Sequence, residues 1–400
     1  MGTIAEKLTY LEGTKSAIKD AIIAKGVEVA DTDTFRSYAE KIESIEAGGS
    51  CESQSKEINI TDNGTRVVTP DEGYLLNQVT VTTNVITGKP ELPNGISFEG
   101  STWATFDTDP YDWSQVYSGT NMFYNCPNLQ TLTGTGIENV YFLDLDSTFY
   151  NCRSLIEIPA LNGKPTTIKG IFEWCSNLDE VDFSGFDLSD LTNIQSAFHY
   201  CKEWVQNIDF RNSPIRIASS AYASSSITQL PLINYALVES ASYMFSLTKL
   251  TSANLDFQRV INAGSLFYGC NTLEEVHFSG MKFNESIDNM FNNCINLTTI
   301  TGLQCGSVKL VTNAFSSCTE LKNIDGLFNL GESFTGSLTI NLSSSPLLTR
   351  ESCLNIFNTI YDFIGNGSTY RPSLDLHQSV LEQLSEEDIA IATAKGWTVQ

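Results

Sequence analysis

The chain has 400 residues, of which 41% are hydrophobic and 18% are charged, and its formal net charge is −24 at pH 7. This acidic balance disfavours nucleic-acid binding and adhesion to anionic lipid, because both need clustered Lys and Arg. No run of about 18 apolar residues occurs, so we expect no membrane insertion and no nucleic-acid partner.

Residues 1–47 are predicted to form a helical anchor or oligomerisation segment. Over residues 3–26 apolar side chains recur every three or four residues, interrupted by Lys15, as in a coiled-coil seam. Two interpretations stay open: a hairpin that packs on a second helix after Thr34, or an oligomerising stalk, with a trimer favoured. The segment lacks the basic start and apolar core of a secretory signal, so we expect folding in a reducing cytosol. The candidate oligomerisation residues are Ile4, Leu8, Leu11, Ile18 and Ile22.

Residues 52–88 are predicted to form a small all-β module. The stretches KEINIT and QVTVTTNV alternate apolar and polar residues, as half-buried strands do. The sequence Asp62-Asn63-Gly64 between them is a strong turn signal. Further on, Trp103, Tyr111, Trp113 and Tyr117 precede the first repeat. We expect them to cap the following domain; if exposed, they would stack on sugar.

Residues 89–335 are predicted to form a repeat solenoid, because one pattern recurs through them. An aromatic residue is followed three positions later by Cys in seven of nine copies, and six positions later usually by Leu. Nine positions later the residue is usually Ile, Val or Leu. Successive aromatics are 26, 23, 26, 24, 23, 22, 24 and 24 residues apart. They are Phe123, Phe149, Phe172, Phe198, Tyr222, Phe245, Phe267, Phe291 and Phe315.

Each unit is expected to contain a short helical or 3₁₀ turn that carries the aromatic and the Cys, followed by a short strand. One unit cannot bury its apolar edge alone, so the units stack and the aromatics and thiols form internal ladders. The regular Cys spacing favours buried, reduced thiols over disulfides or zinc ligands. The units at Tyr222 and Phe245 lack the Cys, and irregular curvature is expected there.

Side chains between the buried strand positions are predicted to point outward as a polar, acidic strip. Repeat proteins commonly bind partners on such a surface; the alternative is a strip that is merely solvated. Cation binding at Glu180, Asp182 and Asp209 is a weaker expectation. The candidate partner-binding strip consists of Thr131, Glu157, Glu180, Asp182, Asn207, Asp209, Asn254, Glu275, His277, Thr299, Asn323 and Asp325.

Residues 336–400 are predicted to form an α/β cap over the last repeat. Residues 349–364 fit an amphipathic helix, and a second helix is predicted to begin at Ser385. Ser385 and Asp388 have the spacing of a capping box, and Gly396 marks the helix end. A final strand is expected at residues 397–399.

The repeat, in copies such as MFYNCPNLQTL and LFYGCNTLEEVHF, resembles the BspA-like leucine-rich repeat of bacterial surface proteins and bacteriophage virion proteins. The resemblance covers about half of the chain. The stretches SAIKDAIIAKGVEVADTDTFRSYAEKIESI and INITDNGTRVVTPDEGYLLNQVTVTTNV look like modules of phage tail and fibre proteins of gut bacteria. The tail LSEEDIAIATAKGWTV is similar to the ends of phage repeat proteins. These resemblances imply a virion component.

No motif for catalysis or cofactor binding occurs. The three His lie in different units, and the chain has neither a nucleophile elbow nor a phosphate-binding loop. We therefore predict no catalytic, cofactor or metal site, and expect that the chain is not an enzyme.

The sequence and its resemblances together predict a bacteriophage virion structural protein, of the fibre or fibre-tip type, made in the host cytoplasm. Its solenoid would attach to a host-surface glycan or protein, and its N-terminal region would contact other virion proteins. The alternative is a bacterial cell-surface adhesin, which would need an export signal or wall anchor. A polysaccharide depolymerase would need a paired acid and base in a groove. Tail fibre and head fibre are not distinguished.

Overall fold

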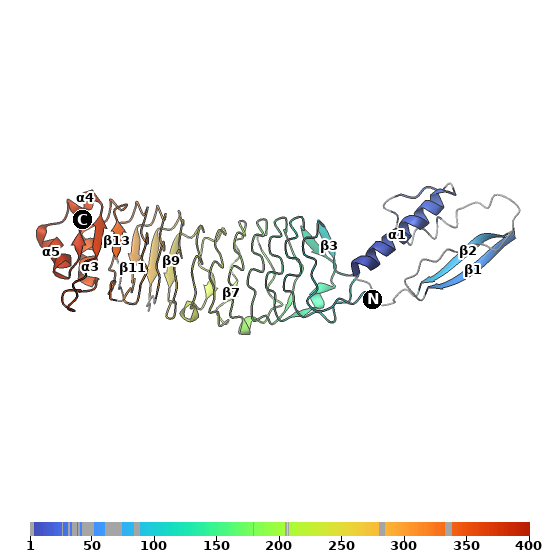
Figure 1. The fold of residues 1–400 in the computed structure, drawn as a ribbon, viewed down its shortest axis with the longest axis horizontal. Helices are drawn as coiled ribbons and strands as arrows, with labels where there is room; N and C mark the ends of the chain where they lie inside the picture. Colours follow the sequence, from blue (N-terminus) through green and yellow to red (C-terminus); the bar gives the residue numbers. More distant parts are fainter. Residues whose placement is uncertain are drawn as a thin grey trace. The chain divides into compact units, whose positions relative to one another are not determined.

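The computed structural model divides the chain into two compact units, Met1–Thr87 and Gly88–Gln400 (Figure 1). The predicted boundaries near residues 50 and 335 fall among residues outside the described part. The structure describes residues 4–25, 27–30, 33, 38, 41, 52–60, 74–83, 89–178, 180–204, 206, 208–279, 285–332 and 338–400.

The first unit contains helix α1 (Ile4–Ile23) and two strands, β1 (Glu52–Ile60) and β2 (Tyr74–Thr83). The strands pair in parallel. In α1, Ile22 is buried against Val29 and Tyr38, and Ile18 packs beside them. Part of the predicted seam is therefore used within this unit. The side chains of Ile4, Leu8 and Leu11, and most of the predicted second helix, lie outside the described residues.

The second unit is a stack of coils followed by a mixed α/β end (Figure 1). Every strand pair described in it is parallel. The strands are β3 (Thr105–Asp107), β4 (Thr131–Thr133), β5 (Tyr141–Phe142), β6 (Asn162–Gly163), β7 (Asp209–Phe210), β8 (Leu232–Ile233), β9 (Ser252–Leu255), β10 (Glu275–Phe278), β11 (Thr299–Thr301), β12 (Asn323–Ile324), β13 (Thr339–Leu342), β14 (Ser373–Leu376) and β15 (Thr398–Val399).

The helical elements of this unit are few and short. The 3₁₀ helices lie outside the segments that carry the repeated aromatics, and the α-helices lie in the C-terminal cap. They are η1 (Ile137–Asn139), η2 (Leu188–Asp190), η3 (Tyr235–Leu237), α3 (Arg350–Thr359), α4 (Gln378–Leu381) and α5 (Glu386–Ala394).

The segment around each repeated aromatic, here called the turn edge, is not the predicted helical turn. Around Phe123, the N–H groups of Asn121, Phe123 and Asn125 donate to the next coil, and those of Met122 and Tyr124 close local turns. This alternation needs left-handed residues two positions before and two after the aromatic, and φ is positive at both places in all nine coils. A helix would instead have used those N–H groups inside the coil.

Left-handed backbone explains why Asn, Ser and Gly recur two positions before and after most of the aromatics. Asn, Ser and Gly tolerate this conformation, and they occupy most of these positions. The four exceptions carry large side chains: Trp174, Tyr200, Tyr243 and Leu247. Trp174 and Tyr200 stack on each other, with ring centroids 3.9 Å apart.

The aromatics and thiols form the two predicted ladders inside the turn edge. Consecutive rings from Phe98 to Phe315 are stacked, with centroids between 5.2 and 6.4 Å apart. Phe98 thus adds a coil before the first predicted one. The Cys294 thiol donates to the Phe267 carbonyl of the preceding coil at 3.0 Å, and the other six repeat thiols make the equivalent bond.

The nine cysteines within the described residues are free and buried, as predicted for reduced thiols. Burial raises the pKa of Cys270 to about 11 and that of Cys318 to about 12. These thiols therefore keep their protons at neutral pH and can donate them to carbonyl oxygens.

The opposite side of the coils, here called the strand edge, is less regular. Among the strands described on this side, β9 to β12 form a continuous sheet of four, and the earlier strands occur in pairs. At Val181 a side chain replaces a strand: the Gln206 amide accepts from its N–H at 3.0 Å and donates to its carbonyl at 2.9 Å. Ile208, which follows one residue late in its repeat, lies just beyond this point.

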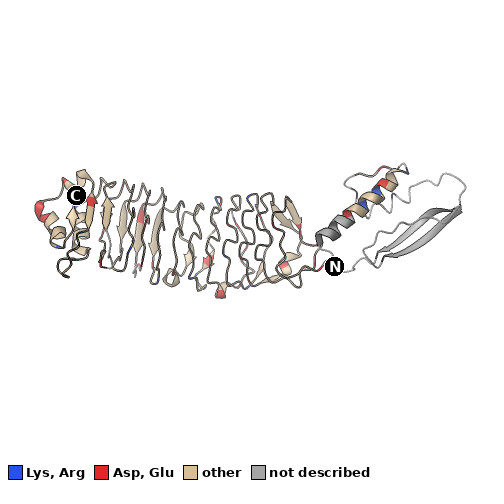
Figure 2. Ribbon diagram, viewed as in Figure 1, with Lys and Arg blue, Asp and Glu red and all other residues tan. Residues whose placement is uncertain are grey.

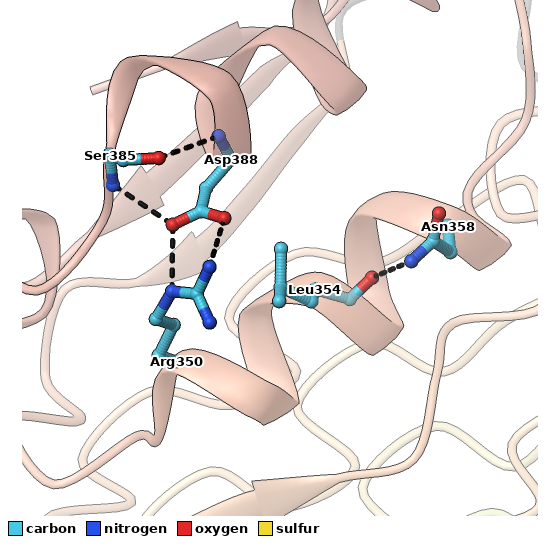
Figure 3. Close-up of polar contacts among 5 residues, drawn as sticks. All are labelled: Arg350, Leu354, Asn358, Ser385 and Asp388. Carbon is cyan, nitrogen blue, oxygen red and sulfur yellow. Dashed lines mark hydrogen bonds and ion pairs between the residues drawn. The ribbon is translucent and has the colours of Figure 1, made fainter.

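The C-terminal cap covers the last coil. The Ser352 hydroxyl of α3 accepts from the Ile324 N–H at 2.7 Å and donates to the Ile324 carbonyl at 3.1 Å. Both backbone groups of Ile324 at the edge of β12 therefore have a hydrogen-bond partner. The predicted capping box of Ser385 and Asp388 forms at the start of α5. Arg350 of α3 binds Asp388 through two hydrogen bonds and thereby links the two helices (Figure 3).

Two details of the cap differ from the prediction. The first helix ends at Thr359, earlier than expected, and the parallel sheet β13-β14-β15 includes two strands that were not predicted. The expected final strand is β15.

Candidate functional site

The C-terminal half of the predicted strip lies on one surface. Strands β9 to β12 alternate buried and outward residues, as period two requires. Glu275 pairs in register with Ser252 and Thr299, and Thr299 pairs with Asn323, so these side chains form one row. Neighbouring members are about 4.8 Å apart along the stack.

A second row runs parallel to the first. Asn254 and Thr301 flank His277 in register, and His277 Nδ1 lies 2.5 Å from the Thr301 hydroxyl. Asp325 follows this row, but its carboxylate is already engaged within the protein. Both of its oxygens accept the Gly302 N–H at 2.9 Å. Gly302 has φ of 74°, and a Cβ there would lie 1.9 Å from the Phe278 carbonyl oxygen. Asp325 therefore has a structural role at the end of the sheet.

The N-terminal members of the strip form a separate, smaller group. Thr131 of β4 pairs with Thr105 of β3 and bridges to Glu157. The Thr131 hydroxyl donates to the Glu157 carboxylate at 3.4 Å. These residues share one face, but no described strand ladder joins them to the rows on β9 to β12.

The middle members of the strip are not brought together as a cation site. Asp182 accepts the Ser184 N–H, and its pKa is lowered by hydrogen bonds from Ser184. Asp209 binds Arg211 through two oxygens, and the Arg211 guanidinium lowers the Asp209 pKa to about 2. Glu180 is exposed, and Asn207 lies outside the described residues.

The described residues contain no group of three or more His, Cys, Asp or Glu that could hold a metal ion. Charged residues are sparse along the coils, where most of the ribbon is uncharged (Figure 2). Among the helices described, none is long and apolar enough to cross a membrane. The geometry of the strip thus offers hydrogen-bonding groups in ordered rows.

The aromatic residues before the first repeat divide into two groups. Tyr111 stacks on Phe106, with centroids 5.6 Å apart, and belongs to the cluster that covers the first coil. Trp113 is buried, and its indole N–H donates to the Thr108 carbonyl at 2.8 Å. Trp103 and Tyr117 are 43% and 52% exposed. The cap was predicted, but the exposed rings were not separated from the buried ones.

A further exposed ring, Tyr141, was missed because it lies outside the repeat consensus. It is 56% exposed on β5 and lines a groove with Tyr117 and Trp113. Its signal in the sequence is an aromatic at the outward position of a short strand, directly before the buried Phe142.

The solved structures that match this chain include a leucine-rich-repeat protein and a domain with a cysteine ladder. A protein from Bacteroides ovatus is 16% identical, with a TM-score of 0.26, and the match covers 74% of this chain and 92% of that one. The functional domain of InlJ from Listeria monocytogenes, which includes a cysteine ladder, is 13% identical, with a TM-score of 0.17. That match covers 65% of this chain and 66% of the other. No curated protein matches the sequence.

The family model of the BspA-type leucine-rich repeat region, with six copies, matches residues 114–202, 172–278 and 241–335. These matches overlap and together extend over more than half of the chain. They include the coils with the aromatic and thiol ladders. The chain therefore belongs to the family of proteins with a BspA-type leucine-rich repeat region.

Proposed function

We propose that this leucine-rich-repeat protein is a structural protein of a bacteriophage virion, of the fibre or fibre-tip type, that attaches to a host surface. The observation that carries the binding role is the pair of outward rows on β9 to β12, where polar side chains repeat in register. Ordered rows of donors and acceptors suit recognition of an extended partner. The resemblance of the flanking segments to phage modules supports the virion role.

In this proposal the N-terminal unit contacts other virion proteins and brings copies of the chain together, with a trimer favoured. Ile22 already packs on Val29 and Tyr38, so the seam available for oligomerisation would be carried mainly by Ile4, Leu8 and Leu11. Light scattering on the full chain tests this role. Leu8→Asn with Leu11→Asn should reduce the oligomer to monomers, and a wild-type monomer would contradict it.

The virion role is tested with antibodies against the full chain. We expect them to label particles purified from a culture of the bacterium that carries the gene, and to leave intact uninfected cells unlabelled. Labelled cells and unlabelled particles would instead identify a bacterial surface adhesin.

The attachment role is tested by binding of the purified chain to host cells. A triple variant, Asn254→Ala, Glu275→Ala and Asn323→Ala, should bind less well because it removes exposed members of both outward rows. The matched control, Gln258→Ala, Asn271→Ala and Glu320→Ala, removes the same charge at exposed positions outside the strip. Equal binding by the two variants would contradict the role of the strip.

We propose that the attachment involves no catalytic step. Loss of host glycan on incubation with the purified chain would contradict this part of the proposal.

A further inference from the structure

A groove in the second unit lies near its first coils, away from the rows on β9 to β12. Its volume is about 540 Å³, and it is partly open to solvent. Residues from three successive parts of the chain line it: Lys89, residues 111–117, and residues 136–141. We call it the tyrosine groove after Tyr117 and Tyr141.

The two tyrosines present aromatic surface to solvent from adjacent coils. Tyr117 is 52% exposed and Tyr141 is 56% exposed. Their coils are held together beside the groove, because the Leu143 N–H donates to the Tyr117 carbonyl at 2.9 Å. The Asn94 side chain accepts the Tyr117 N–H at 2.9 Å, which fixes the backbone that carries this ring. Two large exposed rings on a fixed backbone are prepared to pack against a flat ligand.

The rest of the lining combines apolar residues such as Val116 and Val140 with polar groups whose charges balance. Asp112, Lys89, Ser114 and Asn139 supply a carboxylate, an ammonium, a hydroxyl and an amide. A hydrogen bond from the Ser114 N–H lowers the Asp112 pKa, so this carboxylate is ionised at neutral pH and can accept hydrogen bonds. The groove therefore combines aromatic faces with both donors and acceptors.

We propose that the tyrosine groove binds a neutral oligosaccharide. Sugar rings carry C–H faces that pack on aromatic rings, and hydroxyl groups that use mixed donors and acceptors. An acidic polysaccharide fits less well, because the net charge of the chain is −24.

This inference deepens the host-surface attachment proposed above and rests on that part of it. The two fail separately. If the antibodies label virions but the chain binds no sugar, only the proposal for the groove fails. If the chain binds sugar but is absent from virions, only the virion role fails.

Calorimetric titration of the full chain with neutral hexasaccharides of glucose, mannose, galactose and N-acetylglucosamine provides the test. At least one should bind. Tyr117→Ala and Tyr141→Ala should each weaken binding about tenfold, and the double variant should abolish it. Tyr243→Ala, which removes a ring that is 50% exposed on the turn edge, is the control and should bind like the wild type.

Three results would overturn the proposal: no hexasaccharide binds, the double variant binds as the wild type does, or heparin binds and no neutral sugar does. Since both tyrosines are about half exposed, the variants should fold normally. Circular dichroism and the thermal midpoint check this, and Tyr117→Phe with Tyr141→Phe should retain binding through the rings.

Discussion

The turn edge and the strand edge of the same coils behave differently. Ring stacking continues along the turn edge from Phe98 to Phe315. Thiol–carbonyl bonds also join the coils there, except at Ser225 and Thr248, whose hydroxyls bond within their own coil. Along the strand edge the sheet is interrupted, and at Val181 the Gln206 side chain takes the place of a strand. The difference indicates that the turn edge holds the coils in register, and that the strand edge absorbs the variation in repeat length.

The largest expected effect comes from removing a ladder ring. Phe267→Ala should lower the free energy of unfolding by about 5 kcal/mol, at the upper end for such changes, because Phe267 stacks on Phe245 and Phe291 at 5.8 Å. Phe278→Ala, which deletes the same atoms from the strand edge, should cost about 3 kcal/mol. Urea denaturation measures both. Equal losses would remove the distinction between the two edges.

A smaller loss is expected from Cys294→Ser. The hydroxyls of Ser225 and Thr248 donate to the aromatic carbonyl of their own coil, at 2.7 and 2.8 Å, whereas the thiols reach the preceding coil. A serine at position 294 should do likewise, and weaken the link to Phe267 by about 1–2 kcal/mol. Hydrogen exchange of the two coils reports the loss, and unchanged protection would show that the thiol bond contributes little.

Tyr222 differs from the other stacked rings of the turn edge, because it alone among them carries a hydroxyl. That oxygen is buried and makes no hydrogen bond to any residue that the structure describes. Tyr222→Phe should therefore raise the free energy of unfolding by about 1 kcal/mol. Tyr235→Phe is the counterpart: its hydroxyl donates to the Pro231 carbonyl at 2.8 Å, so its removal should destabilise the protein. A Tyr222→Phe variant less stable than the wild type would contradict this account.

The smallest effect concerns left-handed backbone. Leu247 has φ of 58° and is 48% exposed. Leu247→Asn should stabilise the protein by about 0.5 kcal/mol, part of the roughly 1–2 kcal/mol that this conformation costs a residue with a Cβ. Leu310, which is 52% exposed and has no positive φ, provides the control. Leu310→Asn should leave the thermal midpoint unchanged, and an equal gain in both variants would assign the effect to lost surface hydrophobicity.

The repeat positions could be predicted from the sequence because each obeys a local spacing. Local spacing identifies the ladder aromatics, the thiols and the capping box at Ser385. It also identifies the outward residues of β9 to β12. The predicted helical turn was wrong, because the Asn, Ser and Gly residues that lie two positions from most of the aromatics were not recognised as left-handed.

Other features depend on contacts between distant residues, which spacing does not reveal. Gln206 reaches Val181 across 25 residues, and β13 pairs with β14 across a helix. The division of the strip into separate groups has the same origin, since it follows from which strands pair. Tyr141 could be identified as part of a groove only after its coil had been placed beside that of Tyr117.

The bond pair at Ser352 sets a limit on how copies of this protein can assemble. One hydroxyl engages both the N–H and the carbonyl of Ile324, so β12, the last strand of the four-stranded sheet, has no free backbone at that residue to template a neighbour. Exposed strand edges are where fibrils grow, and this sheet is closed to such growth at Ile324. The length of the array is therefore encoded by the number of repeats in the gene, and a longer reach requires added coils upstream of the cap.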